Sequence, residues 1–257
     1  MKIKQLGIVS GVALATLVTA SAAQAALVVV PPGLNPGDQY RLVFITDGAR
    51  DATSSNINDY NTFVTNQVTG SALATQLTTA GFNLGTITWK AIGSTFATSA
   101  KVNTGTDGSQ PDVPIYLIDG NKVANNNADL WDGSIQTYID RTQIDIQVSS
   151  SVWTGTQADG STSFLPLGNA IGFPPGSGFP PVAALGNTVS LSTAWINGFA
   201  SGPTNEFSLY GMSSVLTVPG TTPAVSVPEP SSLLGLITLG GLMLGGAVRL
   251  TGGGSDT

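Results

Sequence analysis

The sequence predicts a single α+β domain in which one or two early helices precede a loop-rich, mostly antiparallel sheet. Two observations support this prediction. Apolar residues at helical spacing lie near the start of the domain, between residues 57 and 80. Short β-branched and aromatic runs, separated by Gly, Pro, Asn and Asp, follow over most of the remaining chain. Early helices followed by many strands favour an α+β fold, and a β-sandwich with one helical excursion is the alternative.

The first elements are predicted to be a strand and two helices. Residues 40–46 are β-branched and aromatic and are bounded by turn residues, which predicts a strand, and residues 27–30 form a second candidate. Ser54 or Ser55 can cap a helix that ends at Gly70, because apolar residues recur there at helical spacing: Ile57, Tyr60, Phe63, Val64 and Val68. Residues 73–80 predict a second short helix that ends at Gly81.

The rest of the domain predicts short strands joined by polar turns. The strand candidates are residues 86–92, 113–118, 144–148, 152–154, 189–191, 195–196 and 207–216. A doubled Gly-Phe-Pro-Pro at 172–175 and 178–181 predicts an extended or turn segment on the surface. Core positions are predicted for the tryptophans: Trp89, Trp131, Trp153 and Trp195. This order of strand, two helices and loop-rich sheet resembles C-type-lectin and endostatin-like folds.

The domain carries few charges and has neither histidine nor cysteine. Residues 26–226 hold six Lys or Arg and thirteen Asp or Glu, an excess of seven negative charges. They lack the basic cluster that binding to nucleic acid or to anionic lipid requires. The missing cysteines exclude thiol catalysis and thiolate metal sites, and the missing histidines exclude Ser-His-Asp triads and His-ligated zinc. A surface rich in Gly, Ser, Thr, Asn and Gln suits an exported protein among hydrated polysaccharides.

The N-terminal segment has the pattern of a secretory signal peptide. Lys2 and Lys4 precede an apolar stretch over about residues 6–20, and Ala23-Gln24-Ala25 follows as a small-x-small cleavage site. Cleavage after Ala25 would begin the exported domain at residue 26. Residues 1–25 are therefore excluded from the fold prediction.

The C-terminal segment has the composition of a short membrane helix. Residues 233–248 are sixteen uncharged residues that would span about 24 Å as a helix, and residues 231–250 are long enough to cross a bilayer core of about 30 Å. Pro228 and Pro230 set the outer boundary of this helix. A buried glycine-rich core helix is the alternative, but the run is apolar all round and follows a Pro/Thr linker.

These residues resemble a known sorting signal. Val227-Pro228-Glu229-Pro230, the apolar run and the basic Arg249 are similar to the PEP-CTERM signal of exported bacterial proteins. The resemblance covers about residues 226–250 and implies recognition and cleavage by a membrane-embedded exosortase-like enzyme. Members of the family usually end in several arginines, whereas Arg249 stands alone here, which makes it a weak cytoplasmic stop signal.

The predicted organisation follows from the two end segments. It comprises a signal peptide (1–25), a globular exported domain (26–216), a Pro/Thr linker (217–226), a sorting signal with a transmembrane helix (227–250) and a polar tail (251–257). We expect the protein to be exported to the cell envelope, the outer surface or the medium, and to be held transiently in the inner membrane by its C-terminal helix.

One polar loop, between residues 119 and 133, is a candidate metal or glycan site. Its oxygen-bearing and aromatic side chains could hold calcium, or a sugar stacked on tryptophan: Asp119, Asn121, Asn125, Asp129, Trp131 and Asp132. The spacing does not fit an EF-hand, and Asn and Asp also form turns without any ligand. No cofactor other than this possible calcium ion is predicted.

No spacing of carboxylates predicts a catalytic pair. A glycosidase needs two carboxyl groups about 5 to 9 Å apart, and twelve Asp and one Glu permit such pairs without singling one out. Arg41 and Arg50 are expected to form ion pairs with Asp47 and Asp51 at a loop mouth. The sequence therefore predicts a non-catalytic protein that binds or structures exopolysaccharide, with a glycan-active hydrolase and a purely structural matrix protein as alternatives.

Overall fold

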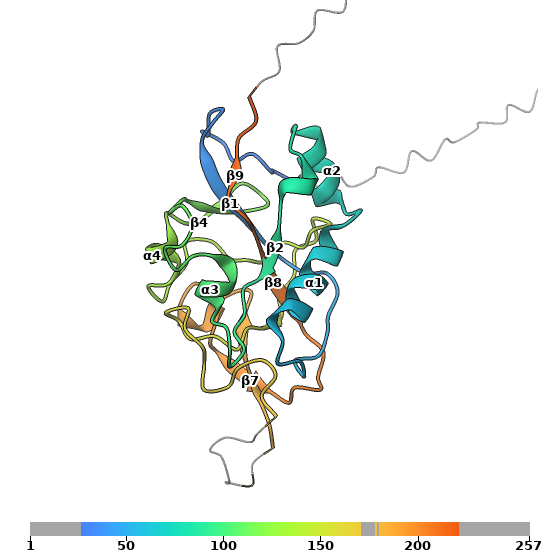
Figure 1. Cartoon of the computed structure of the whole chain (residues 1–257), viewed down its shortest axis with the longest axis vertical. Helices are drawn as coiled ribbons and strands as arrows, with labels where there is room; N and C mark the ends of the chain where they lie inside the picture. Colours follow the sequence, from blue (N-terminus) through green and yellow to red (C-terminus); the bar gives the residue numbers. More distant parts are fainter. Residues whose placement is uncertain (1–26, 171–177, 179, 221–257) are drawn as a thin grey trace, which may run out of the picture. The chain divides into compact units, whose positions relative to one another are not determined.

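The structure, a computed structural model, describes residues 27–170, 178 and 180–220 and confirms the α+β class. These residues form four α-helices and a mostly antiparallel nine-stranded sheet (Figure 1). All of these residues except Gly220 belong to one compact unit, which ends at Pro219. The resemblance to C-type-lectin and endostatin-like folds stays a prediction.

The sheet is built around the long central strands β1 and β8. Its order is β4-β3-β1-β8-β5-β6-β7, with β2 paired to β8 and β9 paired to β1. Two of the pairings, β1 with β3 and β5 with β8, are parallel. The strands are β1 (Gln39–Ile45), β2 (Trp89–Ala91), β3 (Ile115–Leu117), β4 (Lys122–Ala124), β5 (Ser151–Trp153), β6 (Ala183–Asn187), β7 (Phe199–Ser201), β8 (Ser208–Ser213) and β9 (Leu216–Thr217).

The helices begin at polar caps that the sequence makes available. They are α1 (Ile57–Val68), α2 (Ala72–Thr79), α3 (Ala100–Thr104) and α4 (Asn127–Leu130), with 3-10 turns η1 (Leu84–Thr86) and η2 (Thr193–Trp195). The cap of α1 is Asn56 rather than the predicted Ser54 or Ser55, and its side chain accepts a hydrogen bond from the backbone N–H of Asn58. Ser71 caps α2 in the same way.

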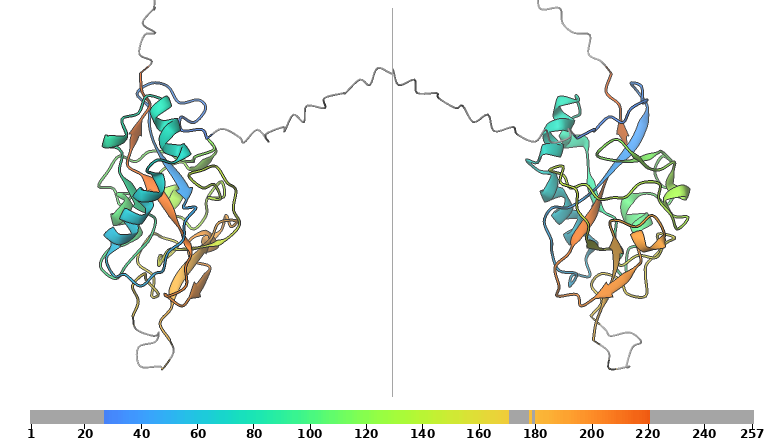
Figure 2. Two further views of the ribbon diagram at one scale, coloured as in Figure 1. Left: turned by 90° about the vertical axis from the view of Figure 1, so that its right-hand side faces the viewer. Right: turned by 180° about the vertical axis from the view of Figure 1, so that it is seen from behind.

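Strand β1 divides the domain into two hydrophobic cores because its side chains alternate between the sheet faces. Tyr40, Leu42 and Phe44 pack with apolar residues of α1 and α2, whereas Val43 and Ile45 pack with residues of β3, α4 and η2. Figure 1 shows α1 and α2 on one side of β1 and β8, and α3 and α4 on the other. The view from behind in Figure 2 shows the same separation. Arg41 shares the face of Val43, so a charged side chain is placed inside the second core.

Four strand predictions were wrong: residues 27–30, 144–148, 189–191 and 195–196. Residues 142–146 form a tight turn in which Asp145 has a φ of +64°, and Gln147 makes only an isolated bridge with Arg141. The alternating apolar residues of 144–148 therefore do not extend as a strand. Val189 and Leu191 lie partly exposed in a turn, and Trp195 ends the 3-10 turn η2. Residues 27–30 are not in a strand either, although the N–H of Val28 donates to the carbonyl of Ile118 at 2.8 Å.

Five short elements, α3, α4, β4, β6 and β7, were not predicted. Each has three to five residues, so none carries enough positions to display a helical or strand period. The end of the domain also differs from the prediction. Thr217 belongs to β9 and Val218 is buried, so the chain continues to pack beyond residue 216.

Several predicted features lie outside the described residues. These are the signal peptide with Ala25, the sorting signal with Val227, Pro228, Glu229, Pro230 and Arg249, and most of the doubled Gly-Phe-Pro-Pro segment. Within the ranges that the structure describes, no helix is long and apolar enough to span a bilayer.

Candidate functional site: a groove along strand β2

Three neighbouring cavities follow strand β2 and share lining residues. We name them the Arg41 cavity, the Asn61 cavity and the Leu84 cavity, with volumes of about 350, 400 and 330 Å³. The first two share Thr88 and Lys90, and the last two share Thr65, Ile87 and Trp89. Together they form the β2 groove. A row of neighbouring cavities along one strand is suited to an extended ligand rather than to a single small molecule.

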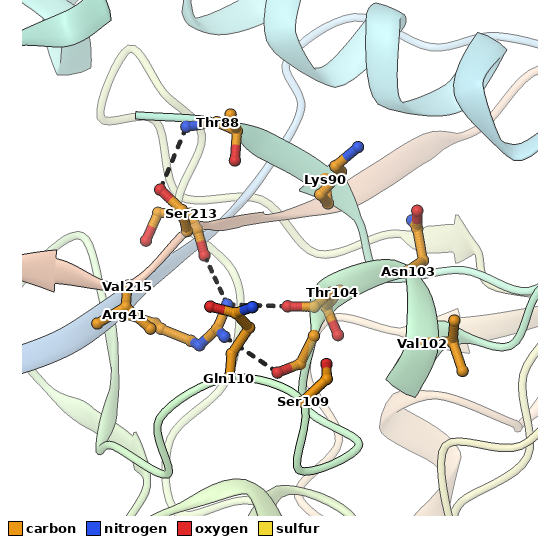
Figure 3. A pocket seen from close by; sticks show the side chains of 12 residues that line it. Arg41, Thr88, Lys90, Val102, Asn103, Thr104, Ser109, Gln110, Ser213 and Val215 are labelled. Carbon is orange, nitrogen blue, oxygen red and sulfur yellow. Dashed lines mark hydrogen bonds between the residues drawn. The ribbon is translucent and has the colours of Figure 1, made fainter. Parts of the chain in front are cut away.

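The Arg41 cavity lies where β1, β2, β8 and α3 come together. Figure 3 shows Arg41 and Lys90 at opposite sides of it, with Gln110 beside the guanidinium. Hydroxyl and amide groups supply most of the remaining polar lining: Thr88, Asn103, Thr104, Ser109, Gln110, Ser213 and Ser214. The cavity therefore offers many uncharged hydrogen-bonding groups around two cations.

Arg41 is the most unusual side chain of the site because it is charged and only 2% exposed. Its Nη1 donates to the carbonyls of Thr104 at 2.9 Å and Ser213 at 3.1 Å, and its Nη2 donates to the carbonyl of Gly105 at 3.2 Å (Figure 3). Its Nε has no hydrogen-bond partner. Burial lowers the pKa of Arg41 because removal from water disfavours the charged form.

Helix α3 presents two of the carbonyls that hold Arg41. Ser99 caps its N-terminus, and Gly105 ends it with a φ of +66°, a left-handed conformation that glycine adopts readily. A Cβ at Gly105 would lie 2.8 Å from Cγ of Gln110, so a larger residue there would displace Gln110. The exposed carbonyls at a helix C-terminus carry partial negative charge, which stabilises the guanidinium without a carboxylate.

Two asparagines close the free edge of β2 at the junction of the Arg41 and Asn61 cavities. Asn61 of α1 accepts the N–H of Ala91 at 2.9 Å, and Asn103 of α3 donates to the carbonyl of Ala91 at 2.8 Å. The two amides also bond each other at 2.9 Å in both directions. These side chains replace a neighbouring strand, so the edge of β2 is paired while the groove beside it stays open.

The polar face of α1 lines the Asn61 cavity. Asn58, Thr62, Thr65 and Asn66 project from this face, whereas Trp89 of β2 is buried beneath it. The Leu84 cavity is more apolar, with Val68, Leu84 and Ile87 among its lining residues. The groove thus changes along its length from charged to polar to partly apolar.

None of the residues lining the three cavities is acidic. Because Arg41 and Lys90 line the Arg41 cavity, this cavity is locally positive. The domain as a whole, in contrast, has an excess of seven negative charges. Among the described residues, Lys90 forms no ion pair and its ammonium group no hydrogen bond. Its charge is available to a ligand in either of the two cavities that it lines.

The structure does not gather the side chains of the predicted calcium or glycan loop around one point. The carboxylate of Asp119 accepts the N–H and the amide of Asn121, and that of Asp129 accepts the N–H of Asn125 at 2.6 Å and the amide of Gln136 at 2.6 Å. Asp132 bonds the backbone and hydroxyl of Ser134. These local hydrogen bonds stabilise turns, which explains why acidic residues occur in this loop. Within the described ranges, no three acidic side chains lie close enough to hold a metal ion.

A repeated Asp-Gly-Ser turn explains part of the acidic composition. It occurs at Asp107, Asp132 and Asp159, and in each case the carboxylate accepts both the N–H and the hydroxyl of the serine two residues later. The side-chain bond to the serine, followed by the backbone bond, lowers the pKa of Asp107 and of Asp159. These carboxylates are occupied within their own turns.

The tryptophans lie in the core, as the sequence predicts. Trp89 and Trp131 are 5% and 6% exposed, and Trp153 and Trp195 are fully buried. Trp131 lines a separate cavity of about 540 Å³ beside Asp107 and Asp112, where its indole N–H donates to the hydroxyl of Thr106. Trp131 therefore borders a cavity, but with only 6% of its surface exposed it offers little area to a stacked sugar.

The ion-pair prediction held for one arginine and was wrong for the other. Arg50 pairs with Asp51 at 3.7 Å and lies over the ring of Tyr60 at 4.3 Å. Arg41 donates hydrogen bonds to backbone carbonyls and forms no ion pair with Asp47, because it lies on the same face of β1 as Val43 and points into the second core.

Asp145 is the one described carboxyl group whose pKa is raised. Burial is the main cause, the nearby Asp119 adds to it, and the ion pair with Arg141 at 3.7 Å opposes it. Asp145 lines none of the four cavities described above. These four cavities therefore do not bring Asp145 together with a ligand space in which it could act as a glycosidase acid.

The β2 groove was not predicted from the sequence. One signal was present, since Arg41 interrupts an otherwise apolar strand where an inward-facing charge is expensive. The contributions of Lys90, Asn61 and Asn103 depend on contacts between distant segments and left no local pattern. Comparison of the chain with protein-family models found no matching family, and comparison with curated proteins found no significant match.

Proposed function

We propose that this protein is exported to the cell envelope or outer surface, where its domain binds matrix polysaccharide in the β2 groove without catalysing a reaction. The export route follows from the two end segments: a signal peptide that ends at Ala25 and a PEP-CTERM-like signal that an exosortase-like enzyme processes around Glu229. Before processing, the C-terminal helix anchors the chain in the inner membrane.

The observation that carries the binding role is the continuity and chemistry of the groove. Three neighbouring cavities share lining residues, and asparagine, threonine, serine and glutamine side chains supply much of that lining. Polysaccharides are long and present many hydroxyl groups, which such side chains bind by hydrogen bonds in both directions. The exposed polar face of α1 provides a wall along which several sugar units could lie.

The same lining favours binding over hydrolysis. A glycosidase places two carboxyl groups across the scissile bond, and the groove contributes none. The hydrolase alternative would require a second site elsewhere on the protein. The purely structural alternative would leave the groove without a glycan ligand.

A blocking substitution in α1 tests the binding role. Thr65 lines both the Asn61 and the Leu84 cavity, so Thr65→Trp would fill the middle of the groove. Thr79→Trp is the matched control, because Thr79 is also exposed and likewise bonds the carbonyl four residues earlier in its helix. Glycan-array binding should be retained by the wild type and Thr79→Trp and lost by Thr65→Trp. Absence of any glycan signal from the wild type would refute the proposal.

A further inference from the structure

We propose that the Arg41 cavity is an anion subsite that selects acidic polysaccharides by binding the monoanionic group of a sugar unit, a carboxylate or a sulfate ester. This inference rests on the proposed glycan-binding role of the β2 groove. It adds the class of glycan, and it assigns the charged end of the groove to the acidic group and the Asn61 cavity to the neighbouring sugar.

The buried guanidinium of Arg41 is not neutralised by any described acidic residue. The two ion pairs among the described residues involve Arg50 and Arg141, and Arg41 contacts only carbonyl oxygens. A guanidinium has five N–H donors, and three are used by Thr104, Ser213 and Gly105. The positive charge and part of the donor capacity therefore remain uncompensated beside the cavity.

Placing such a charge in the interior is unfavourable unless something offsets it. The carbonyls at the end of α3 offset part of the cost, yet the lowered pKa of Arg41 shows that burial still disfavours its charged form. A bound anion would compensate the remaining charge. Arginine is also the side chain whose planar donor set matches carboxylate and sulfate oxygens.

Lys90 supplies a second cation at the point where the Arg41 and Asn61 cavities meet. Its side chain is partly exposed, it lines both cavities, and no acidic residue lines either one. The cavity therefore holds two cations and no carboxylate, although acidic residues outnumber basic ones in the domain by thirteen to six. This distribution would repel other basic groups and attract a single negative group into the cavity.

Uncharged donors beside Arg41 complete the subsite. Gln110, Ser109 and Ser214 line the same cavity as Arg41 (Figure 3). A carboxylate or sulfate oxygen accepts hydrogen bonds from all of these groups. A neutral sugar would leave the two cations without a counter-charge.

The experiment compares charged and neutral forms of the same oligosaccharide. Binding of the full chain in mild detergent to trigalacturonic acid, to its methyl ester and to a sulfated galactan trisaccharide is measured by isothermal titration calorimetry. Because bonds between charged groups strengthen binding substantially, the free acid should bind about tenfold or more tightly than the ester. The sulfated arm tells which anion is preferred, and tight binding of either acidic probe supports the inference.

Variants assign the preference to this cavity. Lys90→Gln should reduce the affinity for the acid towards that of the ester, while Lys122→Gln, which removes the same charge from β4 outside the groove, should leave it unchanged. Arg41→Lys should also weaken acid binding, and thermal unfolding checks that this variant is folded.

Two outcomes separate this inference from the proposed function. If the acid, the sulfate and the ester bind equally and Thr65→Trp still blocks all three, the acidic selectivity is overturned and glycan binding stays intact. A Lys90→Gln variant that retains full preference for the acid would have the same consequence. Failure of both acidic probes to bind would overturn the acidic selectivity, and absence of any signal on the glycan array would overturn the proposed function as well.

Discussion

The amide side chains of Asn61 and Asn103 determine how β2 can border an open groove. Strand edges normally expose N–H and carbonyl groups that attract another strand. Here both groups of Ala91 are satisfied by amides from α1 and α3, at 2.9 and 2.8 Å. Arg41 acts in a similar way, because its side chain donates hydrogen bonds to backbone carbonyls of Thr104, Gly105 and Ser213.

Replacing Asn61 should therefore destabilise the fold. Asn61→Ala removes the acceptor for the N–H of Ala91 and a partner of Asn103, and leaving buried polar groups unpaired costs about 2 kcal/mol in free energy of unfolding. Asn66→Ala on the same helix removes an exposed side chain and should change stability by less than about 0.5 kcal/mol. Urea denaturation of the two variants measures the difference, and equal stabilities would contradict the role assigned to the amide pair.

Close contact between α1 and β8 sets the depth at which the helix lies on the sheet. Gly211 of β8 permits it, since a Cβ there would lie 2.5 Å from Cε1 of Phe44 and 2.8 Å from Cγ1 of Val64. The helix wall of the groove is thus positioned by a glycine in a neighbouring strand.

Gly211→Ala should overpack this contact. We expect a loss of about 2 kcal/mol in free energy of unfolding, because neither Phe44 nor Val64 has space to withdraw in the core. Gly202→Ala is the control, since its Cβ would come no closer than 3.8 Å to the amide of Asn205. Thermal denaturation that gives the same midpoint for both variants would show that the helix can shift freely.

The Asp-Gly-Ser turns and the 142–146 turn should respond oppositely to acid. The folded-state pKa of Asp107 and Asp159 is lowered by their serine partners, so their stabilising contribution is present near neutral pH and is lost as the pH falls through that lowered value. Burial raises the pKa of Asp145, so its contribution becomes more favourable as the pH falls through the raised value.

Carboxyl-carbon NMR titration checks this prediction. Asp107 and Asp159 should titrate below the ordinary range and Asp145 above it. In Ser109→Ala the midpoint of Asp107 should rise while that of Asp159 stays constant. A common midpoint for all three carboxyl groups would contradict the proposed effects of the turns.

The sequence predicted the elements that display a period and missed those that do not. Helices α1 and α2 and strand β1 were predicted within a few residues, because each carries enough positions to reveal its buried face. Short pieces such as β7 and α4 have no such pattern. The alternating apolar residues around Asp145 predicted a strand, but the left-handed conformation at that residue makes a turn.

The site was less accessible to prediction than the fold. The acidic residues near Trp131 were predicted to be possible ligands, yet their carboxylates accept hydrogen bonds from nearby backbone N–H groups. The groove arises only when β1, β2, α1 and α3 meet, and its residues are separated by up to 174 positions between Arg41 and Val215. Cavities formed by such distant segments depend on tertiary packing that a local pattern does not encode.

The proposed sorting route makes a prediction for the full chain. Glu229→Ala should block processing at the PEP-CTERM-like signal and leave an uncut precursor in the membrane fraction, because the exosortase-like enzyme would no longer recognise the motif. Glu206→Ala is the control, because it removes the other glutamate of the sequence from the globular domain, outside the sorting signal. Cell fractionation with mass spectrometry of the C-terminus measures the outcome, and normal maturation of Glu229→Ala would count against the route.

The central claim is that the β2 groove is the glycan-binding site. Amide chemical-shift mapping of the isotope-labelled protein during titration with an acidic oligosaccharide that it binds tests this most directly. The account predicts that the perturbed amides concentrate at Thr65, Thr88 and Lys90 along the groove. Perturbations confined to the loop around Asp129 and Trp131, or an unchanged spectrum, would contradict it.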